Sequence, residues 1–236
     1  MVPTGLVPAV LFHGEDNGDG GISTSRSLVW ESDAILYALD EQFPDTPRLM
    51  MKENNEFATA LEMQERLQLA GVRFAYGGRN QTLADNEKMK LRNDFETALD
   101  ELNTALGEQQ QRIVDDGNTA SAGCFRLGTE FSGVDAMLIP TLERWRYQLP
   151  VTENLDILRD RIHLRQWFNH LDSFLPYSER VAGDEYSWTA TASQFLRYFG
   201  GGEDKPEVAA AIERADSTAK KLANEFSSSY NINTKQ

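Results

Sequence analysis

Apolar residues recur at helical spacing through most of this chain, and this periodicity constrains the fold more than any other feature. One series consists of Leu91, Phe95, Leu99, Leu102 and Leu106. Spacings of three and four residues place such a series on one face of an α-helix. Similar series predict a long helix that ends near Gly77, a helix that follows Ser132, and helices over about 154–174 and 206–226. From residue 54 onward we therefore expect an all-helical part.

The beginning of the chain has a different pattern. Residues 7–12 and 28–30 are short apolar runs, and each predicts a β-strand. Val7-Pro8 opens the first run, and the second leads directly into Glu31-Ser32 and a helical pattern over 32–40. Phe43-Pro44 should end that helix, because the residue before a proline is pushed out of the α region. The whole pattern predicts an α+β protein.

Residues 15–27 between the two expected strands are rich in Gly, Ser and acidic side chains. Glu15 to Ile22 imitates the first eight positions of a calcium-binding loop. The twelfth position, however, is Arg26, where such a loop needs a bidentate glutamate. We interpret this segment as an acidic, flexible insertion, and we expect no metal.

Charge and cysteine content narrow the class of function. The 236-residue chain has 37 acidic and 23 basic residues, a formal charge of −14, which disfavours nucleic acid and anionic membrane surfaces as partners. Cys124 is the single cysteine, so no internal disulfide is expected. No apolar run approaches the roughly 20 residues that cross a bilayer. We expect a cytoplasmic protein, unless residues upstream of Met1 carry a targeting segment.

Several other residues invite a functional interpretation, and for each a structural one is favoured. Cys124 has no nearby histidine to activate it, so a partly buried structural thiol is expected. His163 and His170 share a helix face but lack a carboxylate partner for a metal site. Ser132 and Asp135 have the spacing of a helix N-cap and its acidic partner.

Aromatic residues gather near the C-terminus, and two interpretations stay open for them. They are Tyr186, Trp188, Phe195, Tyr198 and Phe199. Core packing, or shielding of a neighbouring surface, is slightly favoured over a role in lining a pocket.

Four segments together resemble the glutathione S-transferase superfamily. They are Val7–Val10, Val29–Pro44, Phe131–Trp145, and Leu164–Trp167 followed by Leu171 and Pro176. The resemblance covers roughly residues 2–180 and fades beyond Val181. It implies a thioredoxin-like domain over residues 1–46, a linker over 47–53 and an all-helical C-terminal domain over 54–236. The family's first strand, first helix and second strand would precede Val7, so the thioredoxin-like domain is expected to be partial.

The resemblance also implies a glutathione site at Val7, Pro8, Glu31 and Ser32. Pro8 would be the cis-proline that turns the strand, so that the backbone of Val7 pairs with the cysteinyl part of glutathione like an added strand. The Glu31 carboxylate suits the γ-glutamyl ammonium, and Ser32 at a helix start suits its carboxylate. Each pair also has a simpler interpretation. Val7-Pro8 could only mark an edge strand or a turn, and Ser32 could be only a helix N-cap.

Two kinds of function follow from the resemblance. The first is a glutathione transferase that acts on a small hydrophobic electrophile in detoxification, by conjugation or by glutathione-dependent reduction. Its catalytic Tyr, Ser or Cys is unknown and is expected upstream of Met1. The second is a non-catalytic binding or scaffold module of the same fold, and a thiol-transfer activity is a weaker third. Glutathione is the expected co-substrate, and a homodimer is the default assembly.

Overall fold

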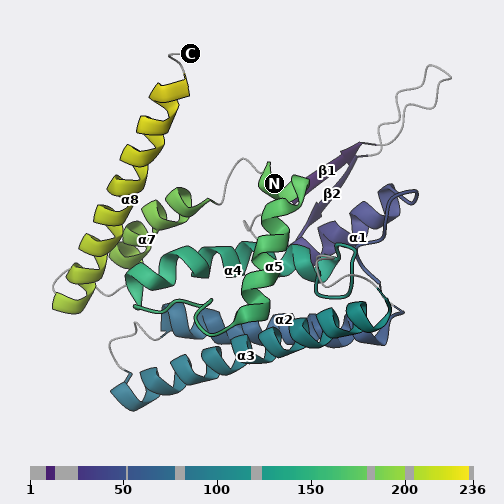
Figure 1. Cartoon of the computed structure of the whole chain (residues 1–236), viewed down its shortest axis with the longest axis horizontal. Helices are drawn as coiled ribbons and strands as arrows, with labels where there is room; N and C mark the ends of the chain where they lie inside the picture. The colour runs from purple at the N-terminus through teal and green to yellow at the C-terminus, as the bar shows by residue number, and fades with distance from the viewer. Residues whose placement is uncertain are drawn as a thin grey trace.

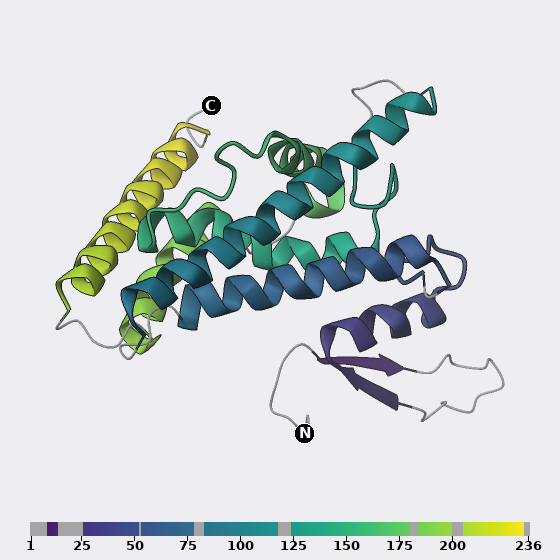
Figure 2. The ribbon, with the colours of Figure 1, turned by 90° about the horizontal axis from the view of Figure 1, so that it is seen from below.

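The computed structural model describes residues 9–13, 26–51, 53–77, 83–117, 124–179, 184–199 and 205–233. Strands β1 (Ala9–His13) and β2 (Arg26–Trp30) form an antiparallel pair in which Val10 lies opposite Val29 and Leu11 opposite Leu28. Helix α1 (Ser32–Gln42) follows β2 and packs against the pair (Figure 2). Leu11 and Leu28 share the other face and stay exposed.

Eight helical elements follow α1 in the described part of the chain. They are α2 (Asn55–Val72), the π-helical turn η1 (Arg73–Gly77), α3 (Asp85–Asp115), α4 (Gly133–Thr152), α5 (Ile162–Ser173), the short α6 (Leu175–Ser178), α7 (Glu185–Phe199) and α8 (Pro206–Asn233). Helices α2 and α3 run side by side, with α4 and α5 packed on them (Figure 1). The expected α+β organisation, a two-stranded sheet before a helical bundle, is confirmed.

The bundle core uses the apolar faces that the periodicity predicts. Phe95, Leu99, Leu102 and Leu106 of α3 are all buried. The Phe95 ring meets the edge of Trp145 from α4 at a centroid distance of 4.9 Å. Aromatic packing of this kind adds to the free energy of burying apolar area, which dominates the stability of a helical bundle.

Polar side chains fix where the helices begin. The Asn54 carboxamide accepts hydrogen bonds from the backbone of Glu56 and Phe57 at the start of α2, at 2.8 and 3.2 Å. Asp135 accepts from the backbone N–H and the hydroxyl of Ser132 at 3.1 and 2.6 Å, before α4. The structural role expected for Ser132 and Asp135 is confirmed.

The sheet with α1 lies at one end of the bundle, and the α7–α8 pair lies at the other (Figure 2). Helices α7 and α8 pack on α4 and enclose a small second core of Leu196, Val208, Ala211 and Ile212. No helix in the described residues is long and apolar enough to span a bilayer.

Two predicted boundaries were wrong. The helix expected from about residue 154 begins only at Ile162. Asn154 and Asp160 adopt positive φ, and the Asp156 carboxylate accepts a hydrogen bond from Leu158 N–H at 2.9 Å. Residues 154–160 therefore form turns and not a helix. The loop expected to reach Ser27 ends earlier, because β2 begins at Arg26.

The expected linker of residues 47–53 is held against α1. The Asp40 carboxylate accepts from the backbone N–H groups of Leu49 and Met50, at 2.8 and 2.7 Å. The division of the chain into domains at residues 46 and 53 stays a prediction. Val7, Pro8 and most of the acidic loop lie outside the described residues.

Candidate functional site

A cavity of about 540 Å³ lies where the start of α1 meets α2 and α4, and we call it the Glu31 cavity. The start of α1 contributes Glu31, Ser32 and Asp33, and β1 contributes Val10. The wall from the bundle includes Gln64, Glu65 and Gln68 of α2 and Met137, Pro140 and Thr141 of α4. The structure therefore brings the predicted Glu31-Ser32 pair to a concave surface between the sheet unit and the bundle.

Glu31 has an unusual backbone conformation at this cavity. Its φ is 72° and its ψ is 134°, a combination that non-glycine residues rarely adopt. Such a conformation costs about 1–3 kcal/mol and persists only where the surroundings impose it. Here Glu31 joins strand to helix, and its C=O accepts the first helical hydrogen bond, from Ile35 N–H at 3.0 Å. Strained residues of this kind cluster at functional sites.

The side chains of Glu31 and Ser32 are exposed and available to a ligand. The Glu31 side chain makes no capping bond to the helix, and no described residue hydrogen-bonds to its carboxylate. Ser32 is the first residue of α1, so its backbone N–H is among those without an intrahelical acceptor. A carboxylate beside a helix N-terminus offers an acceptor for an ammonium group and donors for a carboxylate.

The α2 wall of the cavity is polar. Gln64 is buried, and its Nε2 donates to Gln68 Oε1 at 2.8 Å. Sequence analysis did not single out these residues, since a glutamine between apolar positions predicts only a solvated helix face. Gln64 is buried because α4 packs on α2, whereas Gln68 is exposed.

All the charged side chains on the described wall of the Glu31 cavity are acidic. Among the described residues on its wall, Glu31, Asp33 and Glu65 are acidic and none is a lysine, arginine or histidine. Such a wall favours a ligand with a cationic group. It also disfavours a thiolate, because nearby negative charge raises the pKa of a thiol.

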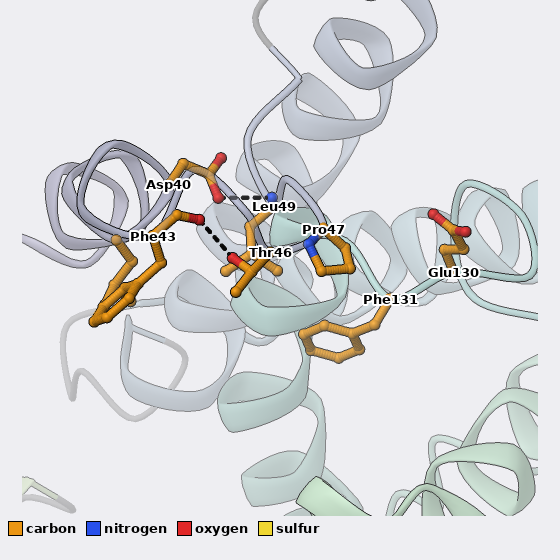
Figure 3. A pocket seen from close by; sticks show the side chains of 8 residues that line it. Asp40, Phe43, Thr46, Pro47, Leu49, Glu130 and Phe131 are labelled. Carbon is orange, nitrogen blue, oxygen red and sulfur yellow. Dashed lines mark hydrogen bonds between the residues drawn. The ribbon is translucent and has the colours of Figure 1, made fainter.

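A second cavity, of about 510 Å³, lies at the far end of α1, and we call it the Phe43 cavity. Phe43 and Phe131 lie on opposite sides of its opening, with Pro47 between them (Figure 3). Asp40 points toward the chain at Leu49, and the Thr46 hydroxyl donates to Phe43 C=O at 2.8 Å. Asp40 and Thr46 thus hold the chain together here, which leaves Glu130 as the further charged side chain on the described wall.

The structure gives Cys124 a structural role. The thiol is half-buried. Burial raises the pKa of Cys124 to about 11, with the Asp135 carboxylate acting in the same direction and Arg126 against it. A thiol with this pKa stays protonated at neutral pH and is a poor nucleophile. The structural interpretation of Cys124 is confirmed.

The two histidines of α5 have other partners. His163 Nδ1 lies 3.2 Å from Gln166 Oε1, and the His170 ring meets the edge of Phe125 at a centroid distance of 4.5 Å. Burial lowers the pKa of His170. No group of three metal-binding side chains occurs among the described residues.

In the aromatic cluster of α7, Trp188 and Phe195 are half-buried and Tyr186 and Tyr198 are exposed, and none of these four lies on the described wall of the Glu31 cavity. Trp188 stacks on the Arg144 guanidinium at 4.7 Å, and Phe195 packs on Tyr76 with centroids 5.4 Å apart. The packing role favoured for the cluster is confirmed for Trp188 and Phe195. Tyr198 is 83% exposed.

Comparison with protein families gives one match. Residues 56–170 match the family described as the C-terminal domain of glutathione S-transferase. This range begins in α2 and ends in α5, so it covers the part of the bundle that forms the α2 and α4 walls of the Glu31 cavity. Comparisons with curated proteins and with solved structures found no match.

Proposed function

We propose, on the premise that this chain is a relative of the glutathione S-transferase superfamily, that it binds glutathione in the Glu31 cavity. The observation that carries the proposal is the strained backbone of Glu31, at the start of α1 and on the cavity wall. A structural N-cap needs no positive φ, since ordinary caps have extended backbone. The strain is explained if the conformation holds the Glu31 carboxylate at the cavity.

The γ-glutamyl end of glutathione has an ammonium and a carboxylate on one carbon. In the proposed complex the Glu31 carboxylate accepts from the ammonium, and the hydroxyl and backbone N–H of Ser32 donate to the carboxylate. Charge-assisted hydrogen bonds of this kind contribute about 1.5–3 kcal/mol each. The acidic wall of the Glu31 cavity supports the placement of the γ-glutamyl ammonium there.

The cysteinyl part of glutathione is assigned to Val7 and Pro8, which precede β1 in the sequence. Val7 would pair with the peptide through its backbone, and Pro8 would set the direction of the chain. Val10, two residues after Pro8, lies on the cavity wall and supports this path for the ligand. The Met137 and Pro140 side chains of α4 offer apolar contacts to a small hydrophobic electrophile.

Transferase activity would need one further group. Conjugation requires a donor that stabilises the glutathione thiolate while the sulfur attacks the electrophile and the leaving group departs. Ser32, Tyr37 and Thr141 are the hydroxyl side chains on the described wall. We assign the activation to none of them.

A non-catalytic binding module is the second candidate, and the charge of the cavity favours it. Glu31, Asp33 and Glu65 would raise the pKa of a bound thiol rather than lower it. A chain that holds glutathione in such surroundings binds the peptide without activating it.

Retention on immobilised glutathione tests binding, and turnover of a chlorodinitrobenzene electrophile tests conjugation. We expect retention of the wild-type chain and loss of retention in the Glu31→Ala variant. Glu153→Ala is the matched control, because Glu153 follows α4 outside the described cavity wall. A chain that flows through unretained would contradict the proposal.

Retention without turnover would select the binding module over the transferase. Glutathione-dependent turnover would select the transferase, and sedimentation of the same sample would test the proposed homodimer.

A further inference from the structure

Arg126 is a buried cation in a tight turn before α4. Phe125 N–H donates to Gly128 C=O at 2.7 Å across the turn, and Arg126 N–H donates to Asp135 Oδ1 at 2.8 Å. These bonds fix the backbone from which the side chain extends. Only 7% of the residue is exposed.

The Arg126 guanidinium lacks an ion-pair partner among the described residues. Its Nε is buried without a hydrogen-bond acceptor, and its Nη2 meets only the Met63 sulfur, at 3.9 Å. The neighbouring residues 118–123 contain no Asp or Glu in the sequence. Burying an arginine without a partner is unfavourable, because the group stays charged in proteins. Burial lowers the pKa of Arg126, and the nearby Glu56 and Asp135 act against this shift.

The guanidinium borders a cavity of about 410 Å³ between α2 and α3, which we call the Arg126 cavity. Thr59 and Met63 of α2 line it, together with Ala105, Gln109 and Arg112 of α3. It is separate from the Glu31 cavity, because Met63 lies on its wall while Leu61, Gln64 and Gln68 of α2 line the other.

Among the described residues, the cavity wall holds as many acidic side chains as cationic ones. Arg112 and Arg126 are opposed by Glu56 and Glu108. Arg112 Nη1 already binds Glu56 Oε1 at 2.5 Å, so Glu56 is engaged on the exposed side of the cleft. The buried Arg126 is the cation that this arrangement leaves without an acceptor.

We propose that the Arg126 cavity binds the carboxylate of a small organic monoacid. The planar guanidinium presents parallel donors that match a carboxylate. Met63 and Ala105 offer apolar contact to the rest of the ligand. A phosphate dianion fits less well, since Glu56 and Glu108 would repel its second charge. This site is independent of glutathione binding in the Glu31 cavity.

Calorimetric titration of the full chain with sodium benzoate, at fixed ionic strength and without glutathione, tests the proposal. We expect one saturable site and an affinity at least tenfold lower in Arg126→Met. Arg66→Met is the matched control, because Arg66 is an exposed α2 arginine paired with Glu101, and benzoate affinity should not change. Glu56→Gln removes a competing carboxylate and should raise the affinity several-fold.

Three results would overturn the proposal. They are the absence of saturable benzoate binding, undiminished binding in Arg126→Met, and tighter binding of inorganic phosphate than of benzoate. Should Arg126→Met lose its helical circular dichroism, Arg126→Lys replaces it, since lysine keeps the charge but loses the paired donors. That variant should still weaken benzoate binding, and unchanged affinity in it would equally refute the site. Retention on glutathione should be the same in both arginine variants, so failure of this site and failure of the proposed function are distinguishable.

Discussion

Replacing Glu31 by glycine should stabilise the junction of β2 and α1 while it abolishes glutathione retention. A φ of 72° with a ψ of 134° costs a glutamate about 1–3 kcal/mol, a cost that glycine avoids because it has no Cβ. Glycine loses more backbone entropy on folding, which offsets about 0.5–1 kcal/mol of that gain. The expected net stabilisation is about 1 kcal/mol.

Urea unfolding followed by circular dichroism, together with amide exchange of α1, measures this effect. Glu31→Ala separates strain from charge, because alanine keeps the strained backbone and loses the carboxylate. It should leave the stability nearly unchanged and still abolish retention. Asp33→Gly is the second control, since Asp33 lies in the first turn of α1, where glycine should destabilise by about 1 kcal/mol.

The sign of the change in Glu31→Gly decides the outcome. A loss of stability as large as that of Asp33→Gly would show that no strain is stored at Glu31. The functional interpretation of the conformation would then fall with it. If Glu31→Gly is more stable but is still retained on glutathione, the backbone of Glu31 is strained and its carboxylate has no role in binding.

Three further perturbations test the packing and the titration of the bundle. Asp135→Ala should lower the free energy of unfolding by at least about 3 kcal/mol, because four buried donors lose their acceptor. Urea unfolding measures this change, and a loss of less than about 1 kcal/mol would refute the prediction. Gly71→Ala should destabilise by about 1–3 kcal/mol, although helix propensity alone favours alanine, because the new Cβ would overlap the buried Trp145 ring; thermal stabilisation would contradict that packing. Cys124 has a thiol pKa of about 11, so its alkylation by iodoacetamide should be slow at pH 7 and rise about tenfold per pH unit beyond pH 9. A rate that levels off near pH 9 would place the pKa near its ordinary value and contradict the raised pKa.

Local signals in the sequence predict the helix start on which the candidate site is built. A helix start was predicted at Ser32 and is confirmed there, because Trp30 ends an apolar run and Phe43-Pro44 ends the helical pattern. Glu31 and Ser32 were selected as ligand groups, and the fold brings both to one cavity. Their role toward glutathione stays a prediction, as do the roles of Val7 and Pro8.

Other features had no local signal. The start of the helix near residue 154 was misplaced because Ile157 is buried and lies seven residues before Leu164, a helical spacing, although it belongs to a turn. Gln64 and Arg126 have the sequence context of solvated side chains, yet both are buried.

The amino-acid sequence by itself determines which face of each helix is apolar, and it marks a helix end where a capping residue or a proline stands, because capping and periodicity act between residues a few positions apart. It also determines the acidic balance and the order of sheet and bundle. The tertiary structure alone decides that Glu31 adopts a positive φ, that the α1 start lies opposite Gln64, and that Arg126 is buried with no ion-pair partner in the part of the chain that the structure describes. These outcomes depend on which faces meet across long stretches of chain, and the residues concerned carry no local mark of their future neighbours.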